Sequence, residues 1–271
     1  MYGGLGNQMF QYSLGRSLSL KKESSLWLDV SWFRRVGNKE NRPYCLNVFN
    51  IKCKEINACL LTGFFSLFKK IIIKEKEFYK FDENILKNNK RYFDGYWQNE
   101  KYFKDIREEL IKDFTLKNGF SEFAEKMNQQ ILSSNSVSLH IRRGDYVQNQ
   151  EANKFHGICS PEYYSQAMNL IEQKIENPHY FVFSDEVGWV RENIKFNYPV
   201  DFVSGNSISE AEELSLMSKC KHNIIANSSF SWWGTWLNTS PEKIVIAPKK
   251  WIENTDLADA SDLIPKEWIK I

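Results

Sequence analysis

The sequence lacks the features that would place the chain in a membrane or on a nucleic acid. No run of 18 apolar residues occurs in its 271 residues, so a membrane-spanning helix is not expected. The 36 basic and 34 acidic residues leave a net charge of only +2, which argues against nucleic acid as a partner. No basic region followed by an apolar stretch opens the chain, so we expect no signal peptide.

Cysteine is scarce, and its spacing matches no known framework. The five cysteines are odd in number and include no C-x-x-C pair, so a disulfide framework or a structural zinc site is not expected. We expect a cytoplasmic chain with reduced thiols. Residues 64–80 mix apolar and charged side chains. An ordinary helix and strand is the favoured interpretation, and weak peripheral contact with the inner face of the cell membrane is the alternative.

Apolar and charged residues occur in the proportions of a folded protein. Hydrophobic residues make up 42% of the sequence and charged residues 26%, which excludes a disordered chain. In the second half, Ser160-Pro161 predicts a helix start, and Ser209 with Glu212 forms the pattern of a capping box. Strands alternating with helices predict a parallel sheet of the Rossmann kind. The predicted strands are 136–141, 180–184, 200–203, 223–226 and 243–247, and the predicted helices are 160–175, 230–237 and one that begins at 209.

The first half gives weaker signals. A glycine loop over Gly3–Gln8 is predicted to lead into an amphipathic helix that ends near Leu20. Because the polar stretch 133–135 precedes the clear series of strands and helices, we expect a domain boundary there, with domains at residues 1–135 and 136–271. Strands are predicted at 25–30 and 91–97, and helices at 100–117 and 122–132.

Three motifs contain residues suited to binding an anion. The glycine loop allows backbone N–H groups to approach a phosphate, although a plain glycine turn explains it equally well. It matches neither G-x-G-x-x-G nor G-x-x-x-x-G-K-[ST], which argues against dehydrogenase and ATPase functions.

The second motif, HIRRGDY at 140–146, follows a predicted strand. In open α/β sheets, ligands lie at the carboxyl ends of strands. Alternation places His140 and Arg142 on one face of the strand and Arg143 on the other. A guanidinium binds a diphosphate with two parallel hydrogen bonds, so we expect Arg142 to bind phosphate. For Arg143 we expect a structural ion pair with Asp145.

The third motif is a strand that ends in Asn227-Ser228-Ser229 before a helix. Backbone N–H groups, hydroxyls and a helix N-terminus then point at one place, which suits an anion, although simple helix capping by Ser228 or Ser229, with no ligand, is the favoured interpretation of this segment taken alone. Glu213, on the preceding predicted helix, could accept hydrogen bonds from a guanine through its two oxygens, although a helix carboxylate that faces solvent is the usual case.

Together, these motifs resemble the α-1,2-fucosyltransferases of glycosyltransferase family 11, in their bacterial form. The resemblance rests on residues 3–11, 140–147, 183–185, 207–237 and 263–271. It implies an α/β fold of the GT-B type, with two Rossmann-like domains that face each other across a cleft. The N-terminal domain would lie on the acceptor side, and the C-terminal domain would bind GDP-fucose. The implied reaction transfers L-fucose, with inversion, to O2 of a terminal β-galactoside, in the biosynthesis of a surface polysaccharide such as lipopolysaccharide or capsule.

The resemblance also implies roles for single residues. Arg142 would hold the pyrophosphate, and Asp145 is the nearest motif carboxylate that could act in catalysis or orient Arg142. No Asp-x-Asp metal motif occurs, so neither a metal nor another cofactor is expected. The remaining substrate-binding residues would be His140 by the nucleoside, Asn227, Ser228 and Ser229 by the phosphates, Gly4, Gly6, Asn7 and Gln8 from the first domain, and Ser184, Asp185 and Glu213.

One departure concerns the start of the fold. Family members have a β-strand before the glycine loop, whereas only Met1 and Tyr2 precede it here, so the first strand is expected to be truncated. Three other functions remain open: a fucosyltransferase of another linkage, an inactive GDP-sugar-binding protein, and a carbohydrate-binding module, which the 15% aromatic content suggests. A carbohydrate-binding module would need neither the arginine motif nor the Asn-Ser-Ser helix start.

Overall fold

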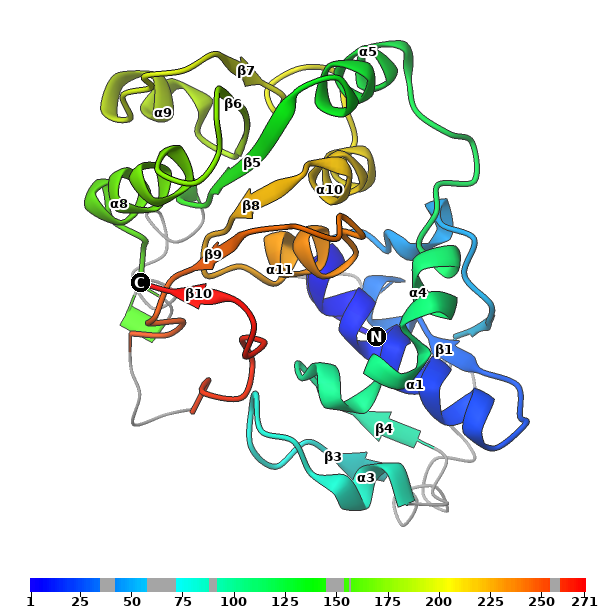
Figure 1. Ribbon diagram of the computed structural model, residues 1–271. Helices are drawn as coiled ribbons and strands as arrows, with labels where there is room; N and C mark the ends of the chain where they lie inside the picture. The colour runs from blue at the N-terminus through cyan, green and yellow to red at the C-terminus, as the bar shows by residue number, and fades with distance from the viewer. Residues whose placement is uncertain (35–41, 58–71, 88–91, 145–153, 156, 254–258) are drawn as a thin grey trace. The chain divides into compact units, whose positions relative to one another are not determined.

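The computed structural model describes residues 1–34, 42–57, 72–87, 92–144, 154–155, 157–253 and 259–271 (Figure 1). The chain divides into two compact units. Unit 1 consists of Met1–Lys117 with Ala258–Leu263, and unit 2 consists of Asn118–Leu257 with Ile264–Ile271.

Unit 2 is built on one parallel sheet of six strands. The strand order is β10-β9-β8-β5-β6-β7, so the chain moves outward from β5 to β7 and then returns to the other side of β5. This reversal places a topological switch point between β5 and β8, where doubly wound sheets bind ligands. The strands are β5 (Asn135–Ile141), β6 (Pro178–Ser184), β7 (Val200–Phe202), β8 (His222–Ile224), β9 (Val245–Ala247) and β10 (Ile269–Lys270).

The helices of unit 2 begin where their capping residues predict. Ser160 accepts a hydrogen bond from the N–H of Tyr163 ahead of a first-turn proline. Ser209 and Glu212 form a complete capping box, which satisfies two backbone donors at that helix end. The helices are α5 (Glu122–Leu132), α8 (Pro161–Glu172), α9 (Val187–Asn193), α10 (Glu210–Lys219) and α11 (Ser229–Trp236).

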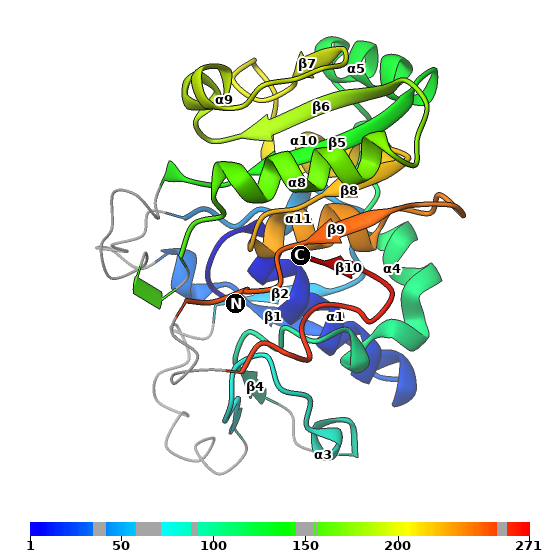
Figure 2. The same cartoon turned by 60° about the vertical axis from the view of Figure 1, so that its left-hand side comes forward.

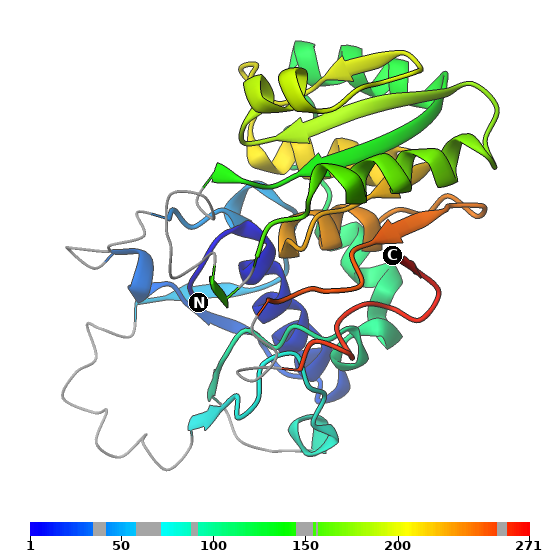
Figure 3. The ribbon, with the colours of Figure 1, turned by 90° about the vertical axis from the view of Figure 1, so that its left-hand side faces the viewer.

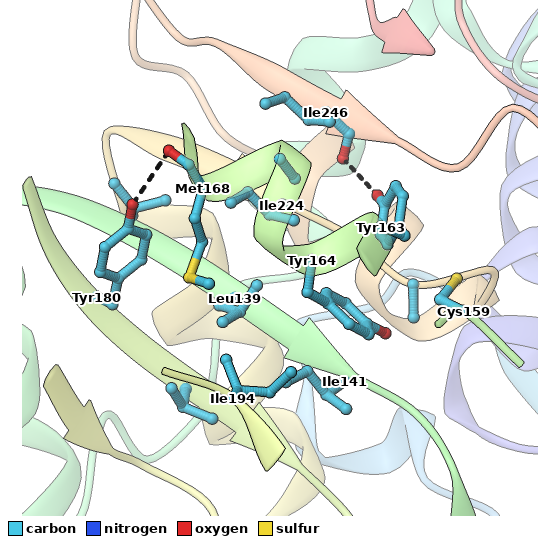
Figure 4. Packing of buried hydrophobic residues seen from close by; sticks show 14 of the residues in the cluster. Leu139, Ile141, Cys159, Tyr163, Tyr164, Met168, Tyr180, Ile194, Ile224 and Ile246 are labelled. Carbon is cyan, nitrogen blue, oxygen red and sulfur yellow. Dashed lines mark hydrogen bonds between the residues drawn. The ribbon is translucent and has the colours of Figure 1, made fainter. Parts of the chain in front are cut away.

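Helices cover both faces of this sheet, as Figure 2 shows for α8 in front of the strands and α10 behind them. Val137, Leu139 and Ile141 of β5 join the buried cluster that includes α8 and α9 (Figure 4). In the same cluster, the hydroxyl of Tyr163 donates to the carbonyl oxygen of Ile246 at 3.3 Å. The opposite face packs Phe181 and Phe183 against α5 and α10. Alternation along β5 therefore turns its even-numbered side chains, including His140, toward α10 and α11.

Unit 1 contains a long helix and two short strand pairs. Strand β1 (Trp27–Asp29) pairs in parallel with β2 (Lys54–Ile56), and β3 (Ile72–Lys74) pairs in parallel with β4 (Tyr92–Asp94). Residues 1–4 form no strand. The helices of unit 1 are α1 (Leu5–Lys21), α3 (Glu83–Lys87) and α4 (Arg107–Asp113).

Two predictions about the first half were wrong in detail. The glycine loop is shorter than predicted, because Gly3 turns the chain at a φ of 80° and Gly4 caps α1, so the helix already begins at Leu5. The helix predicted over 100–117 is interrupted and becomes two 3-10 turns followed by α4.

The domain boundary also differs from the prediction, since the division falls after Lys117 and not after residue 135. The reason is α5, whose residues Ala124, Met127 and Ile131 pack into the core of unit 2 beside α10.

The α/β fold class is confirmed, and the two-unit organisation agrees with it. The face-to-face arrangement implied by the resemblance stays a prediction. Within the described part of the chain, no helix has the length and apolar character needed to cross a membrane. Of the segment 64–80, residues 64–71 lie outside the described residues, and 72–74 form β3.

Candidate functional site

Two motifs that are distant in sequence meet at the switch point of unit 2. Strand β5 leads into Arg142, and the adjacent β8 leads into Asn227 and the start of α11. Both strands run in the same direction, so their carboxyl ends lie at the same edge of the sheet. This edge is where an open α/β sheet binds its ligand.

His140 is a neutral, buried group at this edge. Its side chain is 5% exposed, and burial, with a smaller effect from Arg142, lowers its pKa to about 3. The imidazole lies 5.7 Å from the ring of Phe230 in α11. Its Nδ1 atom has no hydrogen-bond partner among the described residues. A buried nitrogen in this state suits a water or a ligand group that can bond to it.

Arg142 follows the last residue of β5. Its Nη1 atom lies 3.1 Å from Oδ2 of Asp185, and the two side chains are 25% and 23% exposed. The guanidinium is therefore held by a carboxylate and accessible at the sheet edge. This combination of fixed geometry and exposure is what binding of an anion requires.

Arg143 is held differently, on the other face of the chain. Its Nε atom lies 3.2 Å from Oε2 of Glu186, and its guanidinium stacks 3.7 Å from the ring centroid of Trp189. Its backbone N–H donates to Oδ1 of Asp185 at 3.0 Å. The predicted structural ion pair exists, but its partner is Glu186. Asp145 lies outside the described residues, so its predicted roles stay predictions.

Gly144 makes room for the carboxylate of Asp185. A Cβ placed on Gly144 would lie 2.8 Å from Oδ2 of Asp185, closer than real contacts allow. Asp185 thus sits against the backbone of the arginine motif, where it touches Arg142 and Arg143 together. This contact gives a physical reason for the glycine at position 144, which the sequence motif alone did not supply.

Ser184 and Glu213 surround a serine that the sequence analysis missed. The N–H of Ser184 donates to Oγ of Ser204 at 3.0 Å, while its own Oγ accepts from the N–H of Glu186. Burial raises the pKa of Glu213 to about 7, and a hydrogen bond with Ser204 opposes that rise. Ser204 follows β7, so the end of a predicted strand was the signal that could have found it.

In the Asn-Ser-Ser segment, Asn227 holds neighbouring loops in place and the two serines form the start of α11. Ser228 caps α11 by accepting from the N–H of Phe230, as the capping interpretation expects. The buried amide of Asn227 donates to the carbonyl oxygens of Gly157 and Trp251, at 3.3 and 3.2 Å. Ser229, half-buried, opens the helix. The side chain of Asn227 therefore ties two loops to the strand end, and contact of Asn227, Ser228 and Ser229 with a phosphate stays a prediction.

In unit 1, the predicted residues form a second scaffold. Gln8 is fully buried and donates to the carbonyl oxygens of Gly3 and Pro43, both at 2.9 Å, while its Oε1 accepts from the N–H of Cys45. Asn7 accepts from Gln98 at 2.6 Å. Gly4 caps α1, and Gly6 is buried in its first turn. Their contact with a substrate stays a prediction.

Comparisons with known proteins give the functional context. An α-1,2-colitosyltransferase of Escherichia coli is 37% identical over 99% of this chain and 96% of its own length. The O-antigen biosynthesis glycosyltransferase WbnK of Escherichia coli is 38% identical over 99% of this chain and 98% of its own. Galactoside α-(1,2)-fucosyltransferase 2 of Gorilla gorilla gorilla is 28% identical over 57% of this chain and 47% of its own.

A family profile agrees with these relatives. The profile described as glycosyl transferase family 11 matches residues 64–271, which contain all of the arginine and Asn-Ser-Ser motifs. With relatives above 30% identity along nearly the whole chain, the chain is a glycosyltransferase, and it belongs to glycosyl transferase family 11.

Proposed function

We propose that this protein is a galactoside α-1,2-fucosyltransferase that transfers L-fucose from GDP-fucose to O2 of a terminal β-galactoside. The observation that carries the proposal is that Arg142 and the segment that begins α11 follow two adjacent parallel strands, at the switch point of a doubly wound sheet. The linkage is supported by two relatives whose names both state α-1,2. The O-antigen relative supports a role in surface polysaccharide synthesis.

The proposed reaction is a single displacement. The oxygen of the galactose 2-hydroxyl forms a bond with C1 of fucose, while the bond between C1 and the β-phosphate oxygen breaks. The electron pair of that bond leaves with GDP, and the hydroxyl proton passes to a base or to solvent. Negative charge grows on the β-phosphate as GDP leaves, so a cation and backbone N–H groups positioned there lower the barrier. Arg142 and the first turn of α11 are suited to this role.

Neutral His140 fits the same site. With its pKa lowered to about 3, it adds no charge at neutral pH, and its buried Nδ1 can bond to one ligand or water atom. Glu213, with a pKa near 7, can accept from the N–H edge of a guanine when ionised. This edge of guanine donates, whereas adenine presents an acceptor there, so GDP is the nucleotide that we expect to bind.

We also propose that transfer needs no metal ion. The support is the pairing of a fixed guanidinium with a helix N-terminus, two groups that can neutralise a diphosphate. Initial rates would be measured with excess EDTA and with added Mn²⁺. Equal rates are expected, and a loss in EDTA that Mn²⁺ restores would refute this part of the proposal.

A second candidate differs only in the sugar. One full-length relative is named for colitose, which is L-fucose without its 3-hydroxyl. A colitosyltransferase would use the same nucleotide groups and form the same linkage, so the arrangement of unit 2 favours neither sugar.

One experiment separates these candidates and the alternatives. The purified chain is incubated with lactose and either GDP-fucose or GDP-colitose, and the product linkage is read by NMR. We expect an α-1,2 product with GDP-fucose at the higher kcat/KM. A preference for GDP-colitose would favour the second candidate. Binding of GDP without any product would indicate an inactive sugar-nucleotide-binding protein, and no GDP binding would favour a carbohydrate-binding module.

A further inference from the structure

Unit 1 contains a carboxylate that binds two consecutive backbone N–H groups of one loop. Glu75 directly follows β3, and its own N–H donates to the carbonyl oxygen of Asp94 in β4 at 2.9 Å. Its side chain turns to the loop after β4, where Oε2 accepts from the N–H of Tyr96 at 2.7 Å and Oε1 accepts from the N–H of Trp97 at 3.1 Å. Burial raises the pKa of Glu75 to about 6, and these two bonds oppose the rise. At neutral pH the carboxylate is therefore ionised and suited to accept from both donors.

The loop is fitted closely to this carboxylate. A Cβ on Gly95 would lie 2.4 Å from Cβ of Glu75, closer than real contacts allow, so the approach requires glycine. Trp97 has a φ of 58°, in the left-handed region that bulky side chains rarely adopt. A strained residue of this kind persists only where its surroundings hold it, and such residues cluster at binding and catalytic sites. Glu75 supplies part of that hold, because it accepts from the N–H of Trp97 itself.

The strained turn places Gln98 against the start of α1. Gln98 is 8% exposed, and its Nε2 atom donates to Oδ1 of Asn7 at 2.6 Å. In Figure 3 the segment that follows β4 runs beside the blue helix α1, and Asn7 lies in the first turn of that helix. Their bond uses one polar atom of each amide. The pair keeps a second donor, Nδ2 of Asn7, and a second acceptor, Oε1 of Gln98.

Aromatic rings adjoin the same loop. The ring centroid of Tyr96 lies 4.8 Å from that of Tyr2, which precedes the glycine loop, and 6.1 Å from that of Phe78. Phe78 is 47% exposed, and Tyr2 and Tyr96 are half-buried. A pyranose presents apolar C–H groups on its faces and hydroxyls around its rim, so rings beside an amide pair match both kinds of surface. An anion would instead call for a cation, and residues 95–98 include none.

We propose that Asn7 and Gln98 form a binding site for two neighbouring hydroxyls of the acceptor sugar, and that Glu75 is a positioning residue that fixes the loop which carries Gln98. The inference rests on the proposed function, because it names residues for the acceptor side of that reaction. A hydroxyl both donates and accepts, so a donor and an acceptor held together can bind two adjacent hydroxyls. Such recognition depends on precise placement, and a residue that fixes the loop therefore affects affinity without touching the sugar.

A purely structural role for Glu75 leads to a different result from a positioning role. If Glu75 only stabilised unit 1, its replacement would lower the melting temperature and leave the relative affinities for different sugars unchanged. If Glu75 positions Gln98, its replacement changes how much each sugar hydroxyl contributes to binding. The discrimination between sugars that differ by one hydroxyl thus separates the two roles.

The test uses the full chain and the variants Gln98→Ala, Glu75→Gln and Glu77→Gln. Glu75→Gln keeps the size of the side chain but replaces an accepting oxygen by an amide nitrogen that only donates. Glu77→Gln is the matched control, because the Glu77 carboxylate is exposed and pairs with Lys80. Saturation-transfer NMR without a donor nucleotide measures binding of lactose and of analogues that lack the 3-, 4- or 6-hydroxyl of galactose. Calorimetry measures GDP binding, and melting curves fix a temperature at which every chain is folded.

We expect the parent to bind at least one analogue about tenfold more weakly than lactose, as the loss of one hydrogen bond implies. Gln98→Ala and Glu75→Gln should lose this discrimination and bind lactose about tenfold more weakly, with GDP binding unchanged, whereas Glu77→Gln should match the parent. Equal discrimination in the parent and in Gln98→Ala, or no lactose binding by the parent, would overturn the site. Discrimination that persists in Glu75→Gln would overturn the positioning role.

Turnover of the parent with GDP-fucose tests the proposed function separately. A chain that binds lactose through this amide pair but forms no fucosylated product would support the binding site and refute the proposed function. A chain that forms the product while Gln98→Ala keeps the discrimination of the parent would support the function and refute the site.

Discussion

The sharpest prediction from the sheet edge concerns the two adjacent arginines, which the structure holds in different ways. Arg142 contacts one carboxylate and is a quarter exposed. Arg143 is held by an ion pair with Glu186 and by stacking on Trp189. Truncating each to alanine therefore removes different things: Arg142→Ala removes a group that we expect to meet the leaving phosphate, and Arg143→Ala removes packing.

The expected magnitudes follow from these contacts. Loss of one preorganised donor to a developing negative charge costs about 3–4 kcal/mol, so turnover of Arg142→Ala should fall roughly 10²–10³-fold. Arg142→Lys keeps the charge but loses the planar fork, and it should also be badly impaired. For Arg143→Ala, a partly exposed ion pair and a cation–π contact add up to about 1–2 kcal/mol of unfolding free energy.

The assay is turnover at saturating GDP-fucose with lactose, measured beside thermal melting. Arg143→Ala is the matched control, since it should melt a few degrees lower while the folded fraction keeps near-normal turnover. If folded Arg142→Ala kept near-normal turnover, the reasoning would be refuted, and the phosphate would have to be held mainly by the start of α11.

Three further predictions concern buried polar groups. The pKa of Glu213 is raised from 4.5 to about 7, so the folded state holds this proton more tightly than the unfolded state, and the parent protein loses stability as pH rises through that range. Urea unfolding from pH 4 to 8 should show the free energy of unfolding of Glu213→Gln rising relative to that of the parent by on the order of 1 kcal/mol. A difference that stays constant with pH would contradict the raised pKa. Asn227→Ala leaves two buried carbonyl oxygens without their donor and should lower the unfolding free energy by about 2–4 kcal/mol in thermal melts. Gln8→Ala breaks three bonds around Gly3, Pro43 and Cys45 and should speed hydrogen exchange across α1, whereas unchanged exchange would show that these bonds do not stabilise the helix start.

Local sequence signals were sufficient for most of unit 2. Strands β5 and β6 are runs of β-prone residues buried on both faces, and four of the helices, α5, α8, α10 and α11, begin with serine caps whose hydrogen bonds are local. The order of the strands does not follow from local signals, because consecutive strands tend to lie side by side, whereas β8 pairs with β5 and not with β7. The sequence therefore predicted that the second and third motifs follow strands of one parallel sheet, but not that these two strands are neighbours.

Unit 1 was harder to predict for a physical reason. Its strands have three residues each, too short for a period of two to be read, and α3 has only five. Strand β3 and the strand pairings depend on contacts between segments distant in sequence, such as Tyr92 with Asp29. The position of α5 depends in the same way on the core of unit 2, so the sequence alone misplaced the domain boundary.

The polar residues of the motifs show a second limit of sequence reading. Asn227 and Gln8 belong to motifs that a ligand could explain, yet each side-chain amide bonds to backbone groups of other segments. The partners of Asn227 lie 24 and 70 residues away in the sequence, and those of Gln8 lie up to 37 residues away. A motif residue can shape a site by fixing the loops around it without touching the ligand. Such partners cannot be read from spacing.

The contacts at the end of β5 suit the role that we propose for Arg142. A group that stabilises charge as it develops must already point at the reacting oxygen, since reorientation during the reaction would consume part of the stabilisation. Asp185 contacts the Arg142 guanidinium and also accepts from the backbone of Arg143, so one carboxylate fixes both the side chain and the loop that carries it. Glu186 and Trp189 then hold the neighbouring arginine on the other face. The two adjacent cations are tolerated because separate carboxylates, Asp185 and Glu186, neutralise them, so the loss of Arg143 leaves Arg142 with its own partner.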